Sequence, residues 1–161
     1  MTRPRIRIRI DDLSGEPTQL LIAAHLAGMH QTSPPESVHA LDMDGLQHPS
    51  ITFWSAWIDD ELAGIGALKT FGDRQGELKS MRVDDRFRGH GVGRALLAHI
   101  IADSRSRGLA SLWLETGTPE DFIPAQRLYE SVGFTECGPF EGYTEDPFSV
   151  YMTLDLEHQP K

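Results

Sequence analysis

The segment between residues 88 and 94 has the residue types of an anion-binding loop. It reads Arg-Gly-His-Gly-Val-Gly-Arg, follows a strand-like stretch ending at Val83, and precedes a long segment with helical periodicity. Glycines let the backbone approach a bulky polyanion and form tight turns. The N-terminus of a helix adds N–H donors and a partial positive charge of about +0.5. With the cationic side chains of Arg86, Arg88 and Arg94 around it, the segment predicts a pyrophosphate cradle.

Two other phosphate-binding motifs have comparable loops. A P-loop needs Lys followed by Ser or Thr at its end, and Gly93-Arg94-Ala95 lacks both. A dinucleotide-binding Rossmann fingerprint is closer, because Glu115 ends the next predicted strand 22 residues after Gly93, where a ribose-binding acid lies in that fold. The Rossmann turn is tight, however, whereas seven residues separate Val83 from Gly91, and only 46 residues follow Glu115. The sequence therefore disfavours both nucleotide-binding motifs.

Hydropathy periodicity predicts the elements that position this loop. Strands are expected at 5–10, 51–58, 62–71, 77–83, 110–116, 134–138 and 148–156, and helices at 17–30, 91–107 and 121–132, with a further short helix within 36–46. Strands 77–83 and 110–116 flank a helix and are expected to pair in parallel, whereas the earlier strands form antiparallel hairpins. This order predicts an α/β fold in one domain over residues 1–161, with a central mixed, mostly antiparallel sheet and helices on both faces.

Two local patterns refine this arrangement. In the first strand we expect Ile6, Ile8 and Ile10 to face inward and the alternating arginines to face outward, as on a charged edge strand that discourages aggregation. Gly64 and Gly66 are unusual inside a strand and indicate a bulge or a close backbone approach.

Composition argues against several classes of partner. The net charge of −9 disfavours binding to nucleic-acid phosphates. Cys137 is the only cysteine, so no intramolecular disulfide can form, which fits a reducing compartment. The N-terminal residues lack the apolar core of a signal peptide, and the longest apolar stretch, residues 20–29, is too short to span a bilayer. The seven histidines show no metal-binding spacing. We therefore expect a cytoplasmic protein with no nucleic-acid, membrane or metal partner.

The glycine loop is accompanied by a second motif. Residues 88–97, Arg-Gly-His-Gly-Val-Gly-Arg-Ala-Leu-Leu, resemble the acetyl-CoA loop of the GNAT family of N-acetyltransferases, written Arg/Gln-x-x-Gly-x-Gly/Ala. Residues 124–134, Pro-Ala-Gln-Arg-Leu-Tyr-Glu-Ser-Val-Gly-Phe, resemble that family's later motif, Ala-x-x-Leu-Tyr followed by Gly-Phe. The resemblance covers about residues 50–155 and implies a GNAT fold. It also implies transfer of the acetyl group of acetyl-CoA to a primary amine of a small molecule or peptide, by direct attack in a ternary complex.

The resemblance also implies roles for individual residues. Tyr129 corresponds to the tyrosine proposed to protonate the departing CoA thiolate, and Glu77 to a strand residue that serves some members as a base. Glu115 is the second candidate for the base, and ordered water is a third. A backbone N–H near Met81 or Val83 is expected to polarise the thioester carbonyl. The residues expected to bind acetyl-CoA are Met81, Arg82, Val83, Arg88, Gly89, His90, Gly91, Val92, Gly93 and Arg94.

Several points stay open at this level. Phe122 stands where the family often has an asparagine that contacts CoA, which slightly favours the alternative of a non-catalytic acyl-CoA-binding module. Residues at the end of the first predicted helix and in the segment that follows it could line the acceptor pocket or form a solvated loop; they are His30, Ser33, Glu36 and His39. Family members are often dimers, so a homodimer is possible. Nothing in the sequence names the amine acceptor.

Overall fold

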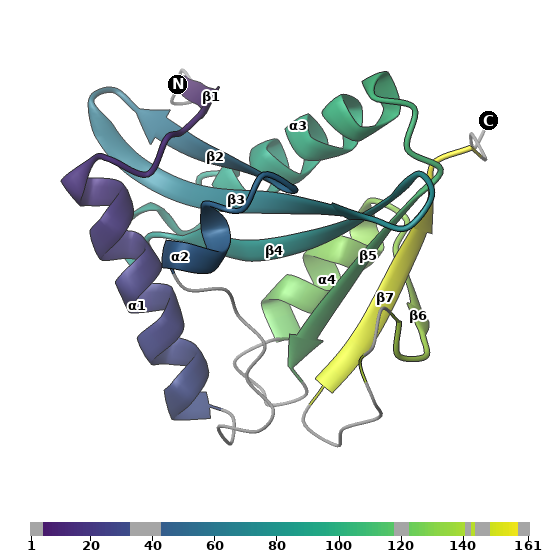
Figure 1. Cartoon of the computed structure of the whole chain (residues 1–161). Coiled ribbons are helices and arrows are strands. Elements are labelled where there is room, and N and C mark those ends of the chain that lie inside the picture. The colour runs from purple at the N-terminus through teal and green to yellow at the C-terminus, as the bar shows by residue number, and fades with distance from the viewer. Residues whose placement is uncertain (1–4, 33–42, 118–122, 141–142, 144–148, 158–161) are drawn as a thin grey trace.

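The computed structural model describes residues 5–32, 43–117, 123–140, 143 and 149–157 (Figure 1). The strands are β1 (Ile6–Ile10), β2 (Ile51–Ile58), β3 (Glu61–Phe71), β4 (Gln75–Val83), β5 (Ser111–Gly117), β6 (Thr135–Cys137) and β7 (Ser149–Asp155). The helices are α1 (Glu16–Thr32), α2 (Met43–Leu46), α3 (Val92–Ser106) and α4 (Ile123–Ser131), with a short 3-10 helix, η2, at Asp85–Phe87. Every predicted strand and long helix is present, and the segment 36–46 lies largely outside the described residues.

The seven described strands form one sheet in the order β1-β2-β3-β4-β5-β7-β6. Only the pair β4–β5 is parallel, and the other five pairs are antiparallel. The predicted mixed, mostly antiparallel sheet is therefore confirmed. None of the described helices is long and apolar enough to cross a membrane.

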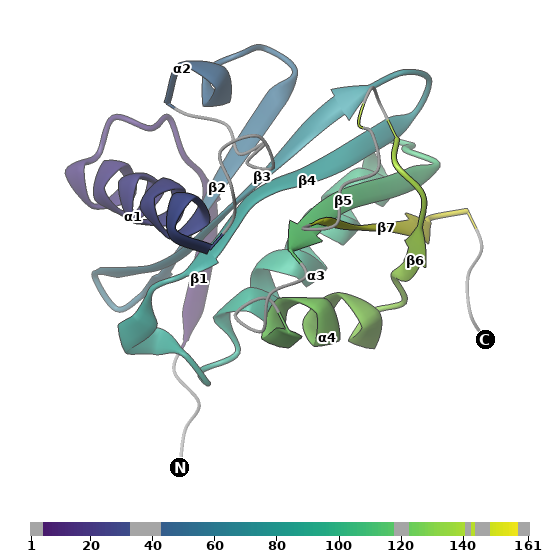
Figure 2. The same cartoon turned by 90° about the horizontal axis from the view of Figure 1, so that it is seen from below.

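Helices cover both faces of the sheet, as predicted, with α1 on one side and α3 and α4 on the other (Figure 2). On the α3 side the core contains Leu96, Leu97 and Ile100 of the helix packed over Leu78 and Leu112 of the strands. A second apolar cluster lies on the α1 side. Its buried members are Leu13, Leu21, Ile22, Leu46, Phe53, Leu62, Ile65 and Ala67. The sheet thus packs against an apolar core on each of its faces.

Strand β1 is at the edge of the sheet, as expected for the strand with alternating arginines. Ile6 and Ile8 are partly buried and pack against the α3-side core. The expectation for Ile10 is wrong, because its side chain is 69% exposed. Ile10 is the last residue of a strand with a neighbour on one side only, so less of the molecule covers it.

The parallel pair β4–β5 separates partway along its length. Pairing runs from Gln75 opposite Ser111 to Leu78 opposite Leu114, but β4 continues to Val83 and β5 to Gly117. Figure 1 shows the two strands meeting at one end and diverging toward their C-terminal ends. The pantetheine arm of acetyl-CoA, in the expectation above, binds the backbone of this unpaired end of β4.

A bulge in β4 lies next to the separation. Ile65 of β3 is opposite Arg82 and Ala67 is opposite Lys79, so β4 carries one residue more than β3 over this interval. Ser80 within the interval has a φ of 56°, in the left-handed region. An extra residue bends the strand and increases its twist, which directs the end of β4 away from β5.

Two glycines of β3 lie directly beneath α3. A Cβ on Gly64 would lie 2.8 Å from Val92 Cγ1 and 3.1 Å from the Arg82 carbonyl oxygen, and one on Gly66 would lie 2.7 Å from Met81 Sδ. The predicted bulge is present, since the β3–β4 register shifts between Ile65 and Ala67. The predicted close backbone approach is present at Gly64, where the close atom is the Arg82 carbonyl oxygen. The absent side chains allow α3 to pack closely on the sheet.

We expect Gly64→Ala to destabilise the protein by about 1–3 kcal/mol, because the added methyl overpacks the contact with Val92 and with a backbone oxygen that cannot move freely. Chemical denaturation measures this free energy. Gly138→Ala is the matched control, because no heavy atom lies within 4 Å of the position of its Cβ. Equal stabilities of the two variants would contradict the close packing of α3 on β3.

Candidate functional site

The loop after β4 presents open backbone at two of its glycines. Gly89 and Gly91 have φ values of +82° and +81°, and a Cβ on either would have no heavy atom within 4 Å. Gly91 is also the N-cap residue of α3 and provides no side-chain capping bond. The N–H groups in the first turn of a helix have no partner within that helix, so this end of α3 is suited to an anion.

Gly93 has a different role from its neighbours. A Cβ there would lie 3.1 Å from Leu128 Cδ2 of α4 and 3.5 Å from Val83 Cγ2. The motif predicts one cradle for the three glycines, whereas Gly93 permits α3, α4 and the end of β4 to pack together. This packing places the helix that carries Tyr129 beside the loop.

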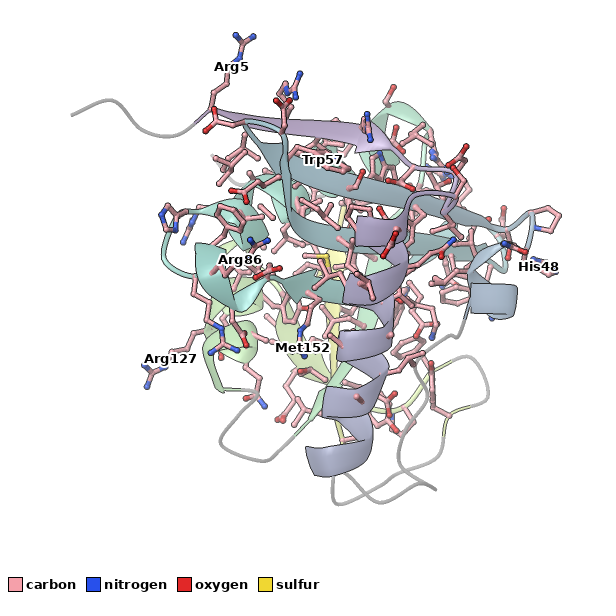
Figure 3. The ribbon with its side chains drawn as sticks, turned by 90° about the vertical axis from the view of Figure 1, so that its left-hand side faces the viewer. Arg5, His48, Trp57, Arg86, Arg127 and Met152 are labelled. Atoms are coloured by element: carbon pink, nitrogen blue, oxygen red, sulfur yellow. The ribbon has the colours of Figure 1, made fainter. Side chains whose placement is uncertain are left out.

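The predicted arginines of the loop are exposed, and each contacts a group of the protein. Their partners, at 2.8–3.3 Å, are Glu61 and Asp84 for Arg86, Asp85 for Arg88 and Ser131 for Arg94. Figure 3 shows Arg86 at the surface. Exposed pairs of this kind stabilise by at most about 1 kcal/mol, so a polyanion can replace these partners. The His90 ring makes a local contact, with Nδ1 3.0 Å from the Phe87 carbonyl oxygen.

Tyr129 lies on α4 with its side chain almost enclosed. It is 7% exposed, and its ring contacts Phe134 edge-on with the centroids 5.8 Å apart. Burial raises the pKa of Tyr129 to about 12. Among the described residues its hydroxyl makes no hydrogen bond. The hydroxyl is therefore a protonated donor that no other described group uses.

Glu77 is buried, at 2% exposure, within a three-residue polar network. Its Oε2 lies 3.0 Å from Lys79 Nζ, which is buried with it, and accepts a hydrogen bond of 2.7 Å from the Tyr143 hydroxyl. Lys79 Nζ also donates to the Tyr143 hydroxyl at 3.0 Å. Burial, and next the charge of Glu77, raise the pKa of Tyr143. Among the described residues the other carboxylate oxygen, Oε1, has no partner.

Sequence reasoning missed Lys79 and Tyr143. Lys79 could have been found, because it lies two residues after Glu77 on the same predicted strand and so on the same face. Tyr143 is 66 residues from Glu77, and no local pattern connects them. Glu115, the second candidate base, accepts a hydrogen bond of 2.7 Å from the Ser149 hydroxyl.

The end of β4 brings together the residues expected to contact the pantetheine arm. Met81 and Val83 pack toward the α3-side core, whereas Arg82 is partly buried and close to His25 of α1. Burial, and then the charge of Arg82, lower the pKa of His25 to about 4. Ser80 Oγ is buried and has no hydrogen-bond partner among the described residues.

Some predicted residues fall outside the described part of the chain. They are Ser33, Glu36, His39 and Phe122, together with the side chain of His30. Within the described ranges, no group of three His, Cys, Asp or Glu side chains is arranged to hold a metal ion.

A family comparison identifies this arrangement. The model of the acetyltransferase (GNAT) family matches residues 18–134, which include the β4 end, the glycine loop and Tyr129. The chain belongs to the GNAT family. The family resemblance predicted from the two motifs is therefore confirmed, and with it the expectation of an acetyl-CoA-dependent N-acetyltransferase.

Curated relatives and solved structures agree with this assignment. The chain is 51% identical to the uncharacterized N-acetyltransferase YsnE of Bacillus subtilis, over 94% of this chain and 100% of that protein. It is 47% identical to the uncharacterized N-acetyltransferase YedL of Escherichia coli, over 92% of this chain and 94% of that protein. A putative acyl-CoA N-acyltransferase from Klebsiella pneumoniae has a similar structure, with a TM-score of 0.77, 27% identity, and coverage of 94% of this chain and 97% of that one. These names favour an enzyme over a non-catalytic acyl-CoA-binding module.

We expect Gly91→Glu to abolish acetyl-CoA binding, because the side chain would fill the open space above the loop and add a negative charge at the N-terminus of α3. Isothermal titration calorimetry with acetyl-CoA measures the affinity. Gly108→Glu is the matched control at the other end of α3, since Gly108 has a φ of +80° and equally open surroundings. Retained affinity in Gly91→Glu, or an equal loss in Gly108→Glu, would show that the loop does not bind the coenzyme.

Proposed function

We propose that this GNAT protein moves the acetyl group of acetyl-CoA to a primary amine of a small molecule or peptide, by direct attack in a ternary complex. The observation that carries the proposal is the separation of β4 from β5 beside a glycine loop with open backbone. The amine nitrogen bonds to the thioester carbonyl carbon, the carbon–sulfur bond breaks, and CoA leaves as a thiolate that takes up a proton.

The residues present fit acetyl-CoA. The backbone at Gly89 and Gly91 is open where a pyrophosphate would lie, and the end of β4 that follows Leu78 is not paired with β5. Ser80 Oγ, buried and unpartnered among the described residues, adds a polar atom at the start of that unpaired end. When bound there, acetyl-CoA supplies the thioester, and the backbone of Met81, Arg82 and Val83 holds the pantetheine arm.

Tyr129 serves as a hydrogen-bond donor to the leaving sulfur. Its pKa of about 12 exceeds the value of about 8.5 typical of a thiol. Full proton transfer from an isolated Tyr129 would therefore be uphill by about 5 kcal/mol. A donor aimed at charge that develops only in the transition state still lowers the barrier, because it needs no reorganisation. The final proton on CoA then comes from solvent.

Glu77 remains our candidate for the group that receives the proton of the amine. Lys79 and Tyr143 both hold its Oε2, which leaves Oε1 as the acceptor within this network.

Direct attack agrees with the raised pKa of Cys137, the single cysteine of the chain. Burial, and then the neighbouring Glu136 carboxylate, raise the pKa of Cys137. Because the thiolate is the reactive form, a raised pKa makes Cys137 a poor nucleophile.

Initial rates with a panel of amines, followed by thiol release, test the proposal. Intersecting double-reciprocal lines support a ternary complex, and parallel lines would indicate a covalent acyl-enzyme instead.

We expect Tyr129→Phe to lower kcat by about 100-fold, the typical loss when one donor to developing charge is removed. The affinity for acetyl-CoA should stay unchanged, because the hydroxyl acts on the sulfur only as the bond breaks. Stopped-assay thiol release gives kcat, and calorimetry gives the affinity. An unchanged kcat would remove Tyr129 from the mechanism.

We expect Glu77→Gln to destabilise the protein by about 3–5 kcal/mol, because it leaves the buried Lys79 ammonium without a counter-ion. The double variant Glu77→Gln with Lys79→Met removes both charges and should recover most of that stability. If Glu77 receives the proton, the double variant stays inactive despite folding normally in thermal melts. Recovery of activity together with stability would assign Glu77 a purely structural role.

A further inference from the structure

The bulge at Ser80 resets which side chains of β4 face each side of the sheet. Leu78 and Met81 both pack in the α3-side core, although they are three positions apart along the strand. In a regular strand, residues three apart point to opposite faces. The opposite face therefore presents Glu77, Lys79 and Arg82, and Arg82 lies close enough to His25 of α1 to affect its ionisation.

Two of these three charges neutralise each other. Lys79 Nζ is 3.0 Å from Glu77 Oε2, and both side chains are more than nine-tenths buried. Arg82 is also partly buried, but its guanidinium makes no ion pair or hydrogen bond among the described residues. The β4 end thus keeps one cation that no described side chain pairs directly, on the side where α1 covers it.

No described neighbouring side chain pairs directly with Arg82. His25, on α1, is neutral at pH 7 because burial and the Arg82 charge lower its pKa to about 4. The Asp84 carboxylate accepts hydrogen bonds from the Arg86 backbone at 2.9 Å and from the Arg86 side chain at 3.3 Å. Against the effect of burial, the hydrogen bonds and charge of Arg86, and then the charge of Arg82, lower the pKa of Asp84. Glu115, on the neighbouring β5, accepts from Ser149 at 2.7 Å. Within the described ranges, Arg82 is therefore available to an external anion.

A partly desolvated guanidinium without a partner is unfavourable unless a ligand supplies one. Its fork of donors fits a carboxylate with two parallel hydrogen bonds. The pyrophosphate cradle is not the natural partner, because it begins after Val83, whose side chain faces α3 and Gly93 on the other side of β4. The remaining ligand at this strand end is the amine acceptor.

We propose that the acceptor is an amino acid or similar amine with a carboxylate near the reactive nitrogen, and that Arg82 binds this carboxylate. This inference rests on the proposed acetyl transfer. Arg82 then determines acceptor specificity through its side chain, while its backbone contributes to holding the coenzyme. A chain with a net charge of −9 would otherwise favour cationic acceptors.

The test compares free amino acids with their amides, pair by pair, in the thiol-release assay. Alanine with alaninamide and aspartate with its diamide are suitable probes. Amidation lowers the pKa of the amine and so increases the free-amine fraction, which works against the expected preference. We nevertheless expect the wild-type protein to prefer the free acids in kcat/KM. Equal or better use of the amides, or transfer only to amines without a carboxylate, would overturn the inference.

Variants then connect the preference to the side chain. Arg82→Gln should raise KM for the free acids by about 10- to 100-fold, the usual loss when a charge-assisted hydrogen bond is removed, and should raise KM for the amides much less. Arg82→Lys keeps the charge but not the fork, so part of the preference should return. Arg105→Gln, an exposed position on α3, removes the same charge as a control. An equal rise in KM for acids and amides would assign Arg82 a structural role instead.

Acetyl-CoA affinity, measured by calorimetry, distinguishes a failure of the Arg82 inference from a failure of the proposed acetyl transfer. A wild-type protein that binds acetyl-CoA and acetylates amines without regard to a carboxylate contradicts only the Arg82 inference. A wild-type protein that does not bind acetyl-CoA contradicts the proposed function and the inference together. A loss of acetyl-CoA affinity confined to Arg82→Gln would overturn the inference, because it would show that the Arg82 side chain binds the coenzyme and not the acceptor.

Discussion

Strand β4 carries one residue more than β3 between Lys79 and Arg82, and Ser80 accommodates it with a φ of 56°. A non-glycine residue in the left-handed region costs about 1–3 kcal/mol. The register holds it in place, because β3 pairs with β4 on both sides of the bulge. The consequence is that β5 leaves β4 after Leu78. Without that separation the last residues of β4 would bond to β5, and no strand edge would face a ligand.

The same bulge gives the two sides of β4 different tasks. On one side, Met81 and Val83 join the core beneath α3, which approaches closely because Gly64 and Gly66 lack side chains. Close-packed cores deform little, so the glycine loop at the start of α3 is positioned rigidly relative to the strand. On the other side, Glu77, Lys79 and Arg82 carry charge. Coenzyme binding and acceptor recognition can therefore differ in chemistry although they meet at one strand end.

Sequence reasoning succeeded where the physical signal is local. Helical periodicity after Gly91 and the helix end at Gly108 each depend on a few neighbouring residues, and the structure has both. The interior glycines of β3 correctly predicted a bulge and a close approach. The bulge's position at Ser80 was not predictable in this way, because serine has no marked preference for positive φ. The separate packing role of Gly93 depends on Leu128, from a helix that follows much later in the chain.

The polar residues around Glu77 were the hardest to predict, because their partners come together only through tertiary structure. A buried pair such as Glu77–Lys79 does not by itself argue for stability, since well-packed apolar residues of similar volume often stabilise as much or more. Charges kept at such a position are better explained by what they present to a ligand. Glu77 and Lys79 cancel, and His25 is neutral because burial and the Arg82 charge oppose its protonation. The electrostatic preference on this side of the strand therefore depends on Arg82, whose guanidinium makes no ion pair or hydrogen bond with a described residue. An acidic protein can in this way present a locally cationic site, because partly buried charges are screened less than those on its surface.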